Sequence, residues 1–280
     1  MAILDRVAEG NECEFVAAVA AELPIQMLAE LFDVPQDDRH KLFEWSNIII
    51  GGDDPDIATS REHVMKAIME MIGYAMQLYQ QRLASPGNDL ISMLVHTQAD
   101  GKPMEVADYL SAFVLLVVAG NETTRNSISG GIQALAMFPE QRRKLIENPG
   151  LIPQAVDEII RWVHPVIYMR RTCLEDTEVG GQMIKAGDKL ALWYLSGNRD
   201  ERKWSDPFRF DVARDGPRHL SFGYGQHLCI GWRLAEIQLT VALEEMLKRF
   251  PDYSVLGTPA RMRSNFLSSI KQMQVQLRAA

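Results

Sequence analysis

The stretch Phe222-Gly-Tyr-Gly-Gln-His-Leu-Cys-Ile-Gly231 places a cysteine at the end of a glycine-punctuated turn and at the start of a helical run. Apolar residues at helical spacing follow over residues 232–250. Cys229 is therefore predicted to lie at a helix N-terminus, where free N–H groups and the helix dipole lower the pKa of a thiol. A cysteine in this position can be a nucleophile, a redox centre or a metal ligand. A nucleophile needs a histidine close by, and His227 is close in sequence.

The other two cysteines, Cys13 and Cys173, are interpreted as small buried apolar residues. Three cysteines far apart in the sequence provide neither a disulfide framework nor a C-x-x-C motif. This usage favours a reduced, cytoplasmic protein.

Composition narrows the class of protein further. The chain has 280 residues, of which 47% are hydrophobic and 24% charged, which suits one large globular domain or two small ones. The net charge of −8, without a basic patch interleaved with aromatic residues, disfavours nucleic-acid binding. The longest apolar run, residues 112–120, is too short for a bilayer, and the first residues lack the apolar core of a signal peptide. A soluble protein without a membrane anchor is predicted.

The periodicity of apolar residues predicts a mostly helical (α+β) fold with small sheets around one long central helix. Helices are expected over residues 14–32, 37–50, 59–83, 88–95 and 151–163, and strands over 178–184, 189–193 and 262–277. The central helix is expected over residues 104–138, a length of roughly 50 Å, and its apolar middle, residues 110–119, indicates burial on all sides.

Polar residues interrupt this central helix at Gly120-Asn-Glu-Thr-Thr124. A carboxylate such as Glu122 is costly in an apolar helix unless it has a partner or a task. An acid beside the hydroxyl of Thr123 suggests proton delivery to a molecule bound there. The structural alternative is a helix bent by hydroxyl groups that bond back to its own carbonyls.

A second polar pair, Glu158 and Arg161, shares one face of a predicted helix at i, i+3 spacing. Alone, such a pair indicates no more than a surface ion pair that contributes little to stability. A second arginine would make it a buried network, and Pro207-Phe-Arg-Phe210 could provide that arginine.

These pieces occur together and in order as Ala119-Gly-x-Glu-Thr-Thr124, Glu158-x-x-Arg161, Pro207-x-Arg-Phe210 and Phe222-Gly-x-Gly-x-His-x-Cys-x-Gly231, with Asn198-Arg-Asp200 between them. In these motifs the chain resembles the cytochrome P-450 superfamily of haem-thiolate monooxygenases. The resemblance covers essentially the whole chain. It implies a single haem-thiolate monooxygenase domain over residues 1–280 that lacks roughly the N-terminal third of the family fold.

The resemblance also implies the roles of the cofactor-binding residues. Cys229 matches the thiolate ligand of the haem iron, a ligand that favours cleavage of the O–O bond. The residues that match the haem surroundings are Phe222 and Gly223 in the ligand loop, His227 and Arg171 at the propionates, and the small Ala119 and Gly120 over the iron.

By the same resemblance, Thr123 and Glu122 match the alcohol and the acid of the oxygen-activation site, with Glu122 relaying protons from solvent. Glu158, Arg161 and Arg209 match a structural triad. The candidates for an apolar substrate pocket are Phe113, Leu116, Val117, Val166, Ile167, Met169 and Phe266, for each of which ordinary core packing is the alternative.

Residues 121–131, 169–172 and 193–200 are similar to those of bacterial alkane and fatty-acid terminal hydroxylases, and sterol side-chain hydroxylases share much of this. The resemblance implies hydroxylation of an unactivated C–H bond, at the terminal methyl of an alkane or fatty acid, with a sterol or terpenoid side chain as the alternative substrate. It implies haem b, O2 and electrons from NAD(P)H through a ferredoxin and a ferredoxin reductase. Arg218 and Arg233 flank the Cys229 loop and could meet an acidic partner.

Two hypotheses from other classes remain at this point. One is a non-catalytic haem-binding fragment, and the other is a cysteine hydrolase that uses Cys229 and His227.

Overall fold

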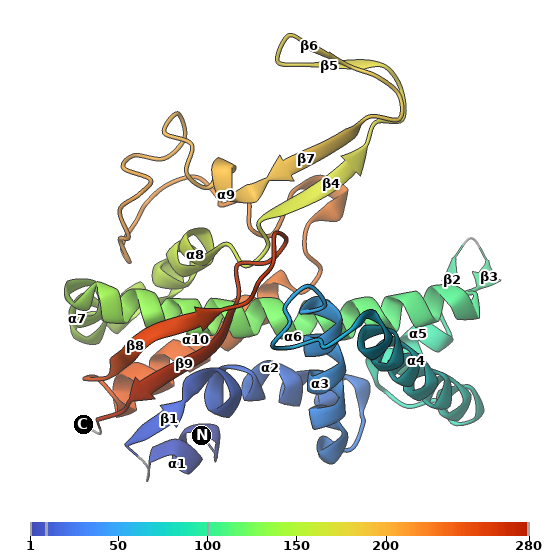
Figure 1. The fold of residues 1–280 in the computed structure, drawn as a ribbon, viewed down its shortest axis with the longest axis horizontal. Coiled ribbons are helices and arrows are strands. Elements are labelled where there is room, and N and C mark those ends of the chain that lie inside the picture. Colours follow the sequence, from blue (N-terminus) through green and yellow to red (C-terminus); the bar gives the residue numbers. More distant parts are fainter. Residues whose placement is uncertain (1, 9–10, 100, 279–280) are drawn as a thin grey trace.

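A computed structural model of the chain describes residues 2–8, 11–99 and 101–278. The fold is dominated by helices with several small sheets, as expected, and is built around helix α6 (Val106–Met137), which runs across the whole width of the molecule (Figure 1). At about 1.5 Å per residue, the 32 residues of α6 span about 48 Å. The predicted central helix is confirmed, but its predicted burial on all sides is wrong, because Leu115 is 65% exposed and Ala119 is exposed.

The elements before α6 are mainly helices. In order they are α1 (Ala2–Ala8), β1 (Glu12–Glu14), the π-helix η1 (Val16–Ala20), α2 (Glu22–Phe32), the 3-10 helix η2 (Gln36–Asp38), α3 (Arg39–Ile50), α4 (Arg61–Ala84), α5 (Leu90–Val95), β2 (Gln98–Ala99) and β3 (Lys102–Pro103). Side chains cap the N-termini of α4 and α5, because the Ser60 hydroxyl accepts a hydrogen bond from His63 N–H and the Asp89 carboxylate accepts one from Ser92 N–H. The helix expected over residues 14–32 is divided into η1 and α2, and α1 was not anticipated.

The elements after α6 alternate helices with short strands. They are α7 (Pro139–Glu147), the 3-10 helix η3 (Pro149–Leu151), α8 (Ile152–Val163), β4 (Tyr168–Thr172), β5 (Thr177–Val179), β6 (Gln182–Ile184), β7 (Lys189–Trp193), α9 (Tyr194–Gly197), the 3-10 helix η4 (Gly225–His227), α10 (Trp232–Arg249), β8 (Ser254–Arg261) and β9 (Ile270–Gln276). The predicted turn between β5 and β6 is confirmed, with Gly180 and Gly181 at φ 58° and 81°. In the tail, β8 begins at Ser254, ahead of the predicted start at residue 262.

The sheets are small and antiparallel. One has the strand order β1-β9-β8, and β2-β3, β4-β7 and β5-β6 are two-stranded. Figure 1 shows β4 and β7 extending away from the helices, with the β5–β6 hairpin at the far end.

Two hydrophobic cores lie along α6. Near its C-terminal end, Ile128, Ile132 and Leu135 pack in one core with residues of α8 and α10. Near its N-terminal end, Tyr109, Phe113 and Val117 pack in another with residues of α2, α3, α4 and α5. The polar stretch from Gly120 to Thr124 lies between the two cores.

Within the part of the chain that the structure describes, α6 is the one helix long and apolar enough to cross a bilayer by length and composition. It also carries the buried ion pair of Glu122 and Arg125 and contacts α2, α3, α8 and α10. These features are typical of a core helix.

Candidate active site

The Cys229 loop is held in shape by two glycines and by main-chain hydrogen bonds. Gly223 and Gly225 have φ of 73° and 68°, and a Cβ at Gly223 would lie 3.1 Å from both the His227 carbonyl and the Tyr194 hydroxyl. Gly223 N–H donates to Leu220 O at 2.8 Å, and Cys229 N–H donates to Phe222 O at 2.8 Å. The loop thus fixes the backbone of Cys229 just ahead of α10, whose N-cap is Gly231.

The Cys229 residue is exposed, and its neighbour Ile230 is 93% exposed. Protein atoms around the sulfur nevertheless desolvate it, and this burial raises the pKa of the Cys229 thiol, while the N–H of Gly231 acts in the opposite direction. The prediction of a lowered thiol pKa is therefore wrong for the protein alone, because desolvation outweighs the N–H group. A metal ion on the sulfur would reverse the balance and favour the thiolate.

One face of α6 is open at its middle. Ala119 and Gly120 are exposed, Thr123 is half-buried, and the Thr123 hydroxyl donates back to the Ala119 carbonyl at 2.8 Å. Leu115, 65% exposed, lies on the same face, since residues 115, 119 and 123 follow at i, i+4 spacing. Sequence reasoning missed Leu115, although its spacing from Thr123 could have identified it.

Glu122 faces away from this opening. Its side chain is 1% exposed and forms an ion pair with Arg125. Arg125 also donates to Asn47 Oδ1 at 3.2 Å, so the pair is joined to α3. Burial raises the pKa of the Glu122 carboxyl, against the lowering effect of Arg125. The carboxylate of Glu122, expected to relay protons from solvent, lies inside a buried polar network.

The same network leaves polar atoms without partners. Within residues 2–8, 11–99 and 101–278, Glu122 Oε1, Arg125 Nε and Asn121 Oδ1 are buried and make no hydrogen bond. Asn121 Nδ2 donates to Ser46 Oγ of α3 at 2.8 Å. Buried polar atoms of this kind are usually satisfied, so their gathering marks a polar region between α6 and α3.

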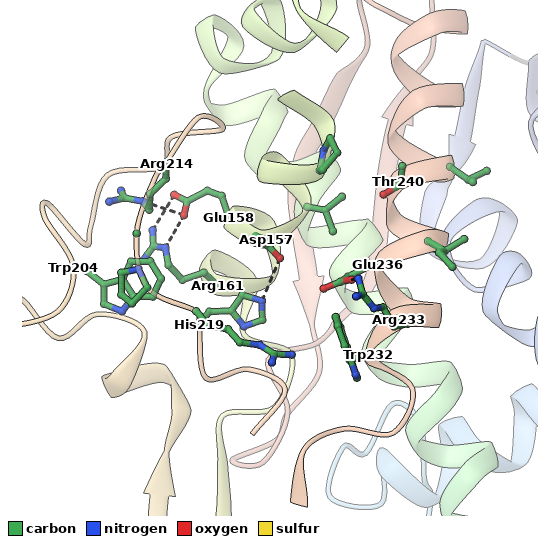
Figure 2. A pocket seen from close by; sticks show the side chains of 17 residues that line it. Asp157, Glu158, Arg161, Trp204, Arg214, His219, Trp232, Arg233, Glu236 and Thr240 are labelled. Carbon is green, nitrogen blue, oxygen red and sulfur yellow. Dashed lines mark hydrogen bonds and ion pairs between the residues drawn. The ribbon is translucent and has the colours of Figure 1, made fainter. Parts of the chain in front are cut away.

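The Glu158–Arg161 pair is buried and bidentate, with Arg161 Nε and Nη2 at 2.6 and 2.9 Å from the two carboxylate oxygens. The third member is Arg214, whose Nε donates to Glu158 Oε2 at 3.1 Å (Figure 2). Arg209 was expected there, but its side chain is 62% exposed and lies 3.8 Å from Asp211. The assignment of Arg209 as an ion-pair partner is therefore wrong, and this residue joins the network through its carbonyl, which accepts from Arg161 at 3.3 Å.

The proposed propionate partners lie on exposed segments. His227 is exposed in η4, and Arg171 is half-buried in β4, opposite Leu190, with Nη1 donating to the carbonyl of Arg170 at 3.0 Å. Phe222 is half-buried against the core, with its ring centroid 5.2 Å from that of His219.

The substrate-pocket candidates separate into two groups. Phe113 and Val117 are fully buried in the core and are wrong as pocket lining, whereas Leu116 is half-buried. The structure brings the remaining segments together, because Ile167 N–H donates to Phe266 O at 2.9 Å and Val166 forms an antiparallel bridge with Leu267. Met169 pairs with Leu192 on the adjoining β4–β7 sheet.

A cavity of about 690 Å³ lies between α8, α10 and the segment ahead of the Cys229 loop (Figure 2). The guanidinium groups of Arg218 and Arg233 lie 4.8 and 4.0 Å from the ring centroid of Trp232, so these two arginines meet on one indole. Asp157 and Glu236 also line the cavity, and burial raises the pKa of both carboxyls. The cavity is thus mixed in charge.

His219 lies at the bottom of this region and is 5% exposed. Burial, with smaller contributions from Arg218 and Arg161, lowers the pKa of His219 to about 4. Asp157 Oδ1 lies 3.8 Å from Nε2, too far for a strong hydrogen bond, so desolvation prevails and the ring is neutral. Nδ1 accepts from Ser221 N–H at 3.3 Å, which ties the ring to the chain just before Phe222.

The model of the cytochrome P450 family matches residues 10–274 of this chain. The chain belongs to the cytochrome P450 family. Members of this family use haem b, O2 and electrons from NAD(P)H, so the hypothesis of a cysteine hydrolase is set aside.

Three curated P450s illustrate its relatives. The chain is 42% identical to a linalool 8-monooxygenase of Pseudomonas putida, over 99% of this chain and 68% of that protein. It is 42% identical to a methyl-branched lipid omega-hydroxylase of Mycobacterium tuberculosis, over 95% and 62%, and 40% identical to a steroid C26-monooxygenase of Rhodococcus jostii, over 99% and 58%. It therefore spans between 58% and 68% of the length of these relatives.

A solved P450 of Mycobacterium marinum in complex with pseudoionone matches with a TM-score of 0.94 at 36% identity, over 99% of this chain and 68% of that one. A P450 of Bacillus subtilis, PksS, matches with a TM-score of 0.90 at 32% identity, over 99% and 71%.

Residues of the Cys229 loop and of α6 in this P450 chain are suited to bind a haem. Cys229 is exposed on a rigid loop, with the N–H of Gly231 directed at its sulfur, as a thiolate ligand requires. The apolar side chain of Ile230, almost fully exposed beside it, is suited to contact a flat apolar group. Ala119 of α6 presents a small side chain on an open helix face.

Proposed function

We propose that this P450 chain binds haem b as one domain and hydroxylates an unactivated C–H bond near the end of an aliphatic chain. The observation that carries the proposal is the pairing of an exposed, loop-held Cys229 with an open face of α6 that presents Thr123. The names of the relatives describe oxidation of linalool, of methyl-branched lipids at the omega position and of steroids at C26. They favour a branched aliphatic chain over a linear alkane.

A haem held by Cys229 would supply the activation of O2. The residues of the chain would prepare its surroundings. The Gly231 N–H donates to the sulfur and tempers its basicity. The Thr123 hydroxyl, which now donates to the Ala119 carbonyl, can rotate to donate to a molecule bound at the open face of α6.

Glu122 would be the proton donor of the site. Burial raises the pKa of its carboxyl, which brings the protonated form closer to neutral pH, and Arg125 limits that rise. A general acid works best with a pKa near the working pH. Glu122 is therefore proposed to deliver protons from the polar region between α6 and α3.

The substrate would lie along apolar side chains. Leu115 and Leu116 of α6, with Val166, Ile167 and Phe266 from the bridged segments, are proposed to line the pocket. Apolar lining with few polar groups suits an aliphatic chain. His227 and Arg171 are proposed to bind the propionates.

Electrons would come from NAD(P)H through a ferredoxin and its reductase in the cytoplasm. Arg218 and Arg233, stacked on Trp232 next to the Cys229 loop, are proposed to meet acidic groups of the ferredoxin. Charge reversal of both should slow reduction of the haem, and an unchanged rate would contradict this contact.

The deciding experiment has two stages. The purified chain is loaded with haem, reduced and exposed to CO, and an absorption band of thiolate-ligated haem is expected. Product analysis then compares dodecanoic acid, linalool and a sterol, with terminal or near-terminal hydroxylation expected for a branched substrate. No thiolate band would refute the haem proposal. A band without product would favour the second candidate, a haem-binding fragment without catalytic activity.

A further inference from the structure

The motif Asn198-Arg199-Asp200 has no role in the function described so far. We propose that Asn198 is a positioning residue that connects the buried Glu158–Arg161 pair of α8 to the Cys229 loop. The consequence for haem ligation rests on the proposed function, whereas the mechanical connection does not.

Asn198 is 0% exposed and lies at the C-terminal cap of α9. Its main-chain carbonyl accepts from Arg161 Nη1 at 2.8 Å. Its side chain faces the other way, because Oδ1 accepts from Leu220 N–H at 2.7 Å and Nδ2 donates to Ser221 Oγ at 2.8 Å. One residue therefore contacts both the ion pair and the chain that leads into the loop.

The hydrogen bonds continue from these contacts to the cysteine. The carbonyl of Leu220 accepts from Gly223 N–H at 2.8 Å, and the carbonyl of Phe222 accepts from Cys229 N–H at 2.8 Å. Ser221 Oγ donates to the carbonyl of Ile160 in α8 at 2.9 Å. The segment from Leu220 to Phe222 is thus fastened on one side to Asn198 and α8, and on the other to Cys229.

An asparagine suits this position. Its side-chain amide offers an acceptor for Leu220 N–H and a donor for Ser221 Oγ from one short planar group. A carboxylate would keep the acceptor and lose the donor, and an apolar residue would leave the partly buried Leu220 N–H without its side-chain partner. The short contact with Arg161 uses the main-chain carbonyl of Asn198, so replacing the side chain removes the loop contacts and one long bond, 3.5 Å, from Nδ2 to the Arg161 carbonyl.

The test is amide hydrogen exchange, measured by mass spectrometry on the chain before and after loading with haem. For Asn198→Ala, peptides that cover Leu220, Gly223 and Cys229 should exchange about tenfold faster, while peptides of α6 should keep their rates. Ser221→Ala removes the contact of Asn198 Nδ2 with Ser221 Oγ and the bond of Ser221 to the Ile160 carbonyl, but leaves Leu220 N–H its acceptor, and should give a smaller, severalfold increase. If Asn198→Ala fails to fold, the increase in Ser221→Ala tests the connection instead. The control is Asn148→Ala, an exposed asparagine whose Nδ2 bonds only to the carbonyl of Lys144, and it should change nothing in the loop.

In the haem-loaded Asn198→Ala variant, the fraction of reduced, CO-bound haem with the thiolate band should fall while the haem content is retained. Unchanged exchange in the loop, or an equal increase in the loop, α6 and α8, would overturn the inference, because the residue would then have no effect or only a general effect on stability. If the unmodified chain shows no thiolate band, the proposed function fails, and the exchange rates still decide the role of Asn198.

Discussion

Replacing Arg214 by alanine should destabilise the protein far more than replacing Arg209, although the family motif points to Arg209. The Arg214 side chain is 10% exposed and donates to Glu158 Oε2 at 3.1 Å. It also donates to the carbonyls of Ser205 at 2.6 Å, Asp206 at 3.1 Å and Arg209. The guanidinium of Arg214 thus binds the buried Glu158 carboxylate and connects it to the main chain of residues 205–209.

The magnitude follows from these contacts. A hydrogen bond to a charged group contributes about 1.5–3 kcal/mol, and the carbonyl bonds add smaller amounts because water can replace part of them. Glu158 keeps Arg161 and the Asp211 N–H, so its charge is not stranded and the full cost of a broken buried pair is not reached. Arg214→Ala should therefore lower the free energy of unfolding by about 3 kcal/mol. Arg209→Ala removes one exposed 3.8 Å ion contact and should cost about 0.5 kcal/mol or less.

Urea unfolding followed by circular dichroism and by tryptophan fluorescence measures both values. Trp204 is a suitable reporter, since the Arg161 guanidinium lies 5.1 Å from its ring centroid. Arg214→Lys keeps the charge but loses the planar fork, so it should recover less than half of the loss. Equal effects of the two alanine variants, or a larger effect for Arg209→Ala, would refute the assignment of Arg214.

Three further outcomes are expected. Cys229→Ala should abolish the thiolate band with little change in the urea midpoint, because the residue is exposed; a retained band would contradict its role as ligand. Arg125→Ala should lower the free energy of unfolding by about 3–4 kcal/mol because it leaves Glu122 buried and unpaired, and adding Glu122→Gln should restore part of it; no restoration would contradict the pairing. His219 has a pKa lowered to about 4, so the unfolded chain takes up its proton first as the pH falls. The contribution of the neutral His219 ring to the free energy of unfolding is complete above about pH 6.5 and decreases toward pH 4. About 2 kcal/mol of this free energy is lost between pH 7 and pH 5. His219→Gln should flatten this slope in urea titrations, and an unaltered slope would argue against a buried neutral ring.

The parts of the fold that were predictable depend on local information. The long helix α6 follows from its continuous apolar composition, and the shape of the Cys229 loop follows from glycines at positive φ. Both features depend only on residues that are adjacent in the sequence. The errors concern orientation. Arg209 and Arg214 lie in the same irregular segment, and only the path of that segment decides which guanidinium reaches Glu158. The same is true of Phe113, which is apolar whether it lines a pocket or, as found, a core.

Orientation also separates Glu122 from Thr123. Adjacent residues on an α-helix point about 100° apart, so the two cannot face the same side of α6. Thr123 lies beside the open face, while Glu122 lies in the buried network with Arg125 and, through it, with Asn47 of α3. In the proposed mechanism, a proton from Glu122 would therefore have to pass around the helix before it reaches the Thr123 hydroxyl. Among the described residues, Glu122 Oε1 has no hydrogen-bond partner, and Arg125 connects the carboxylate to Asn47, so α3, a helix distant in sequence from Glu122, forms part of its surroundings.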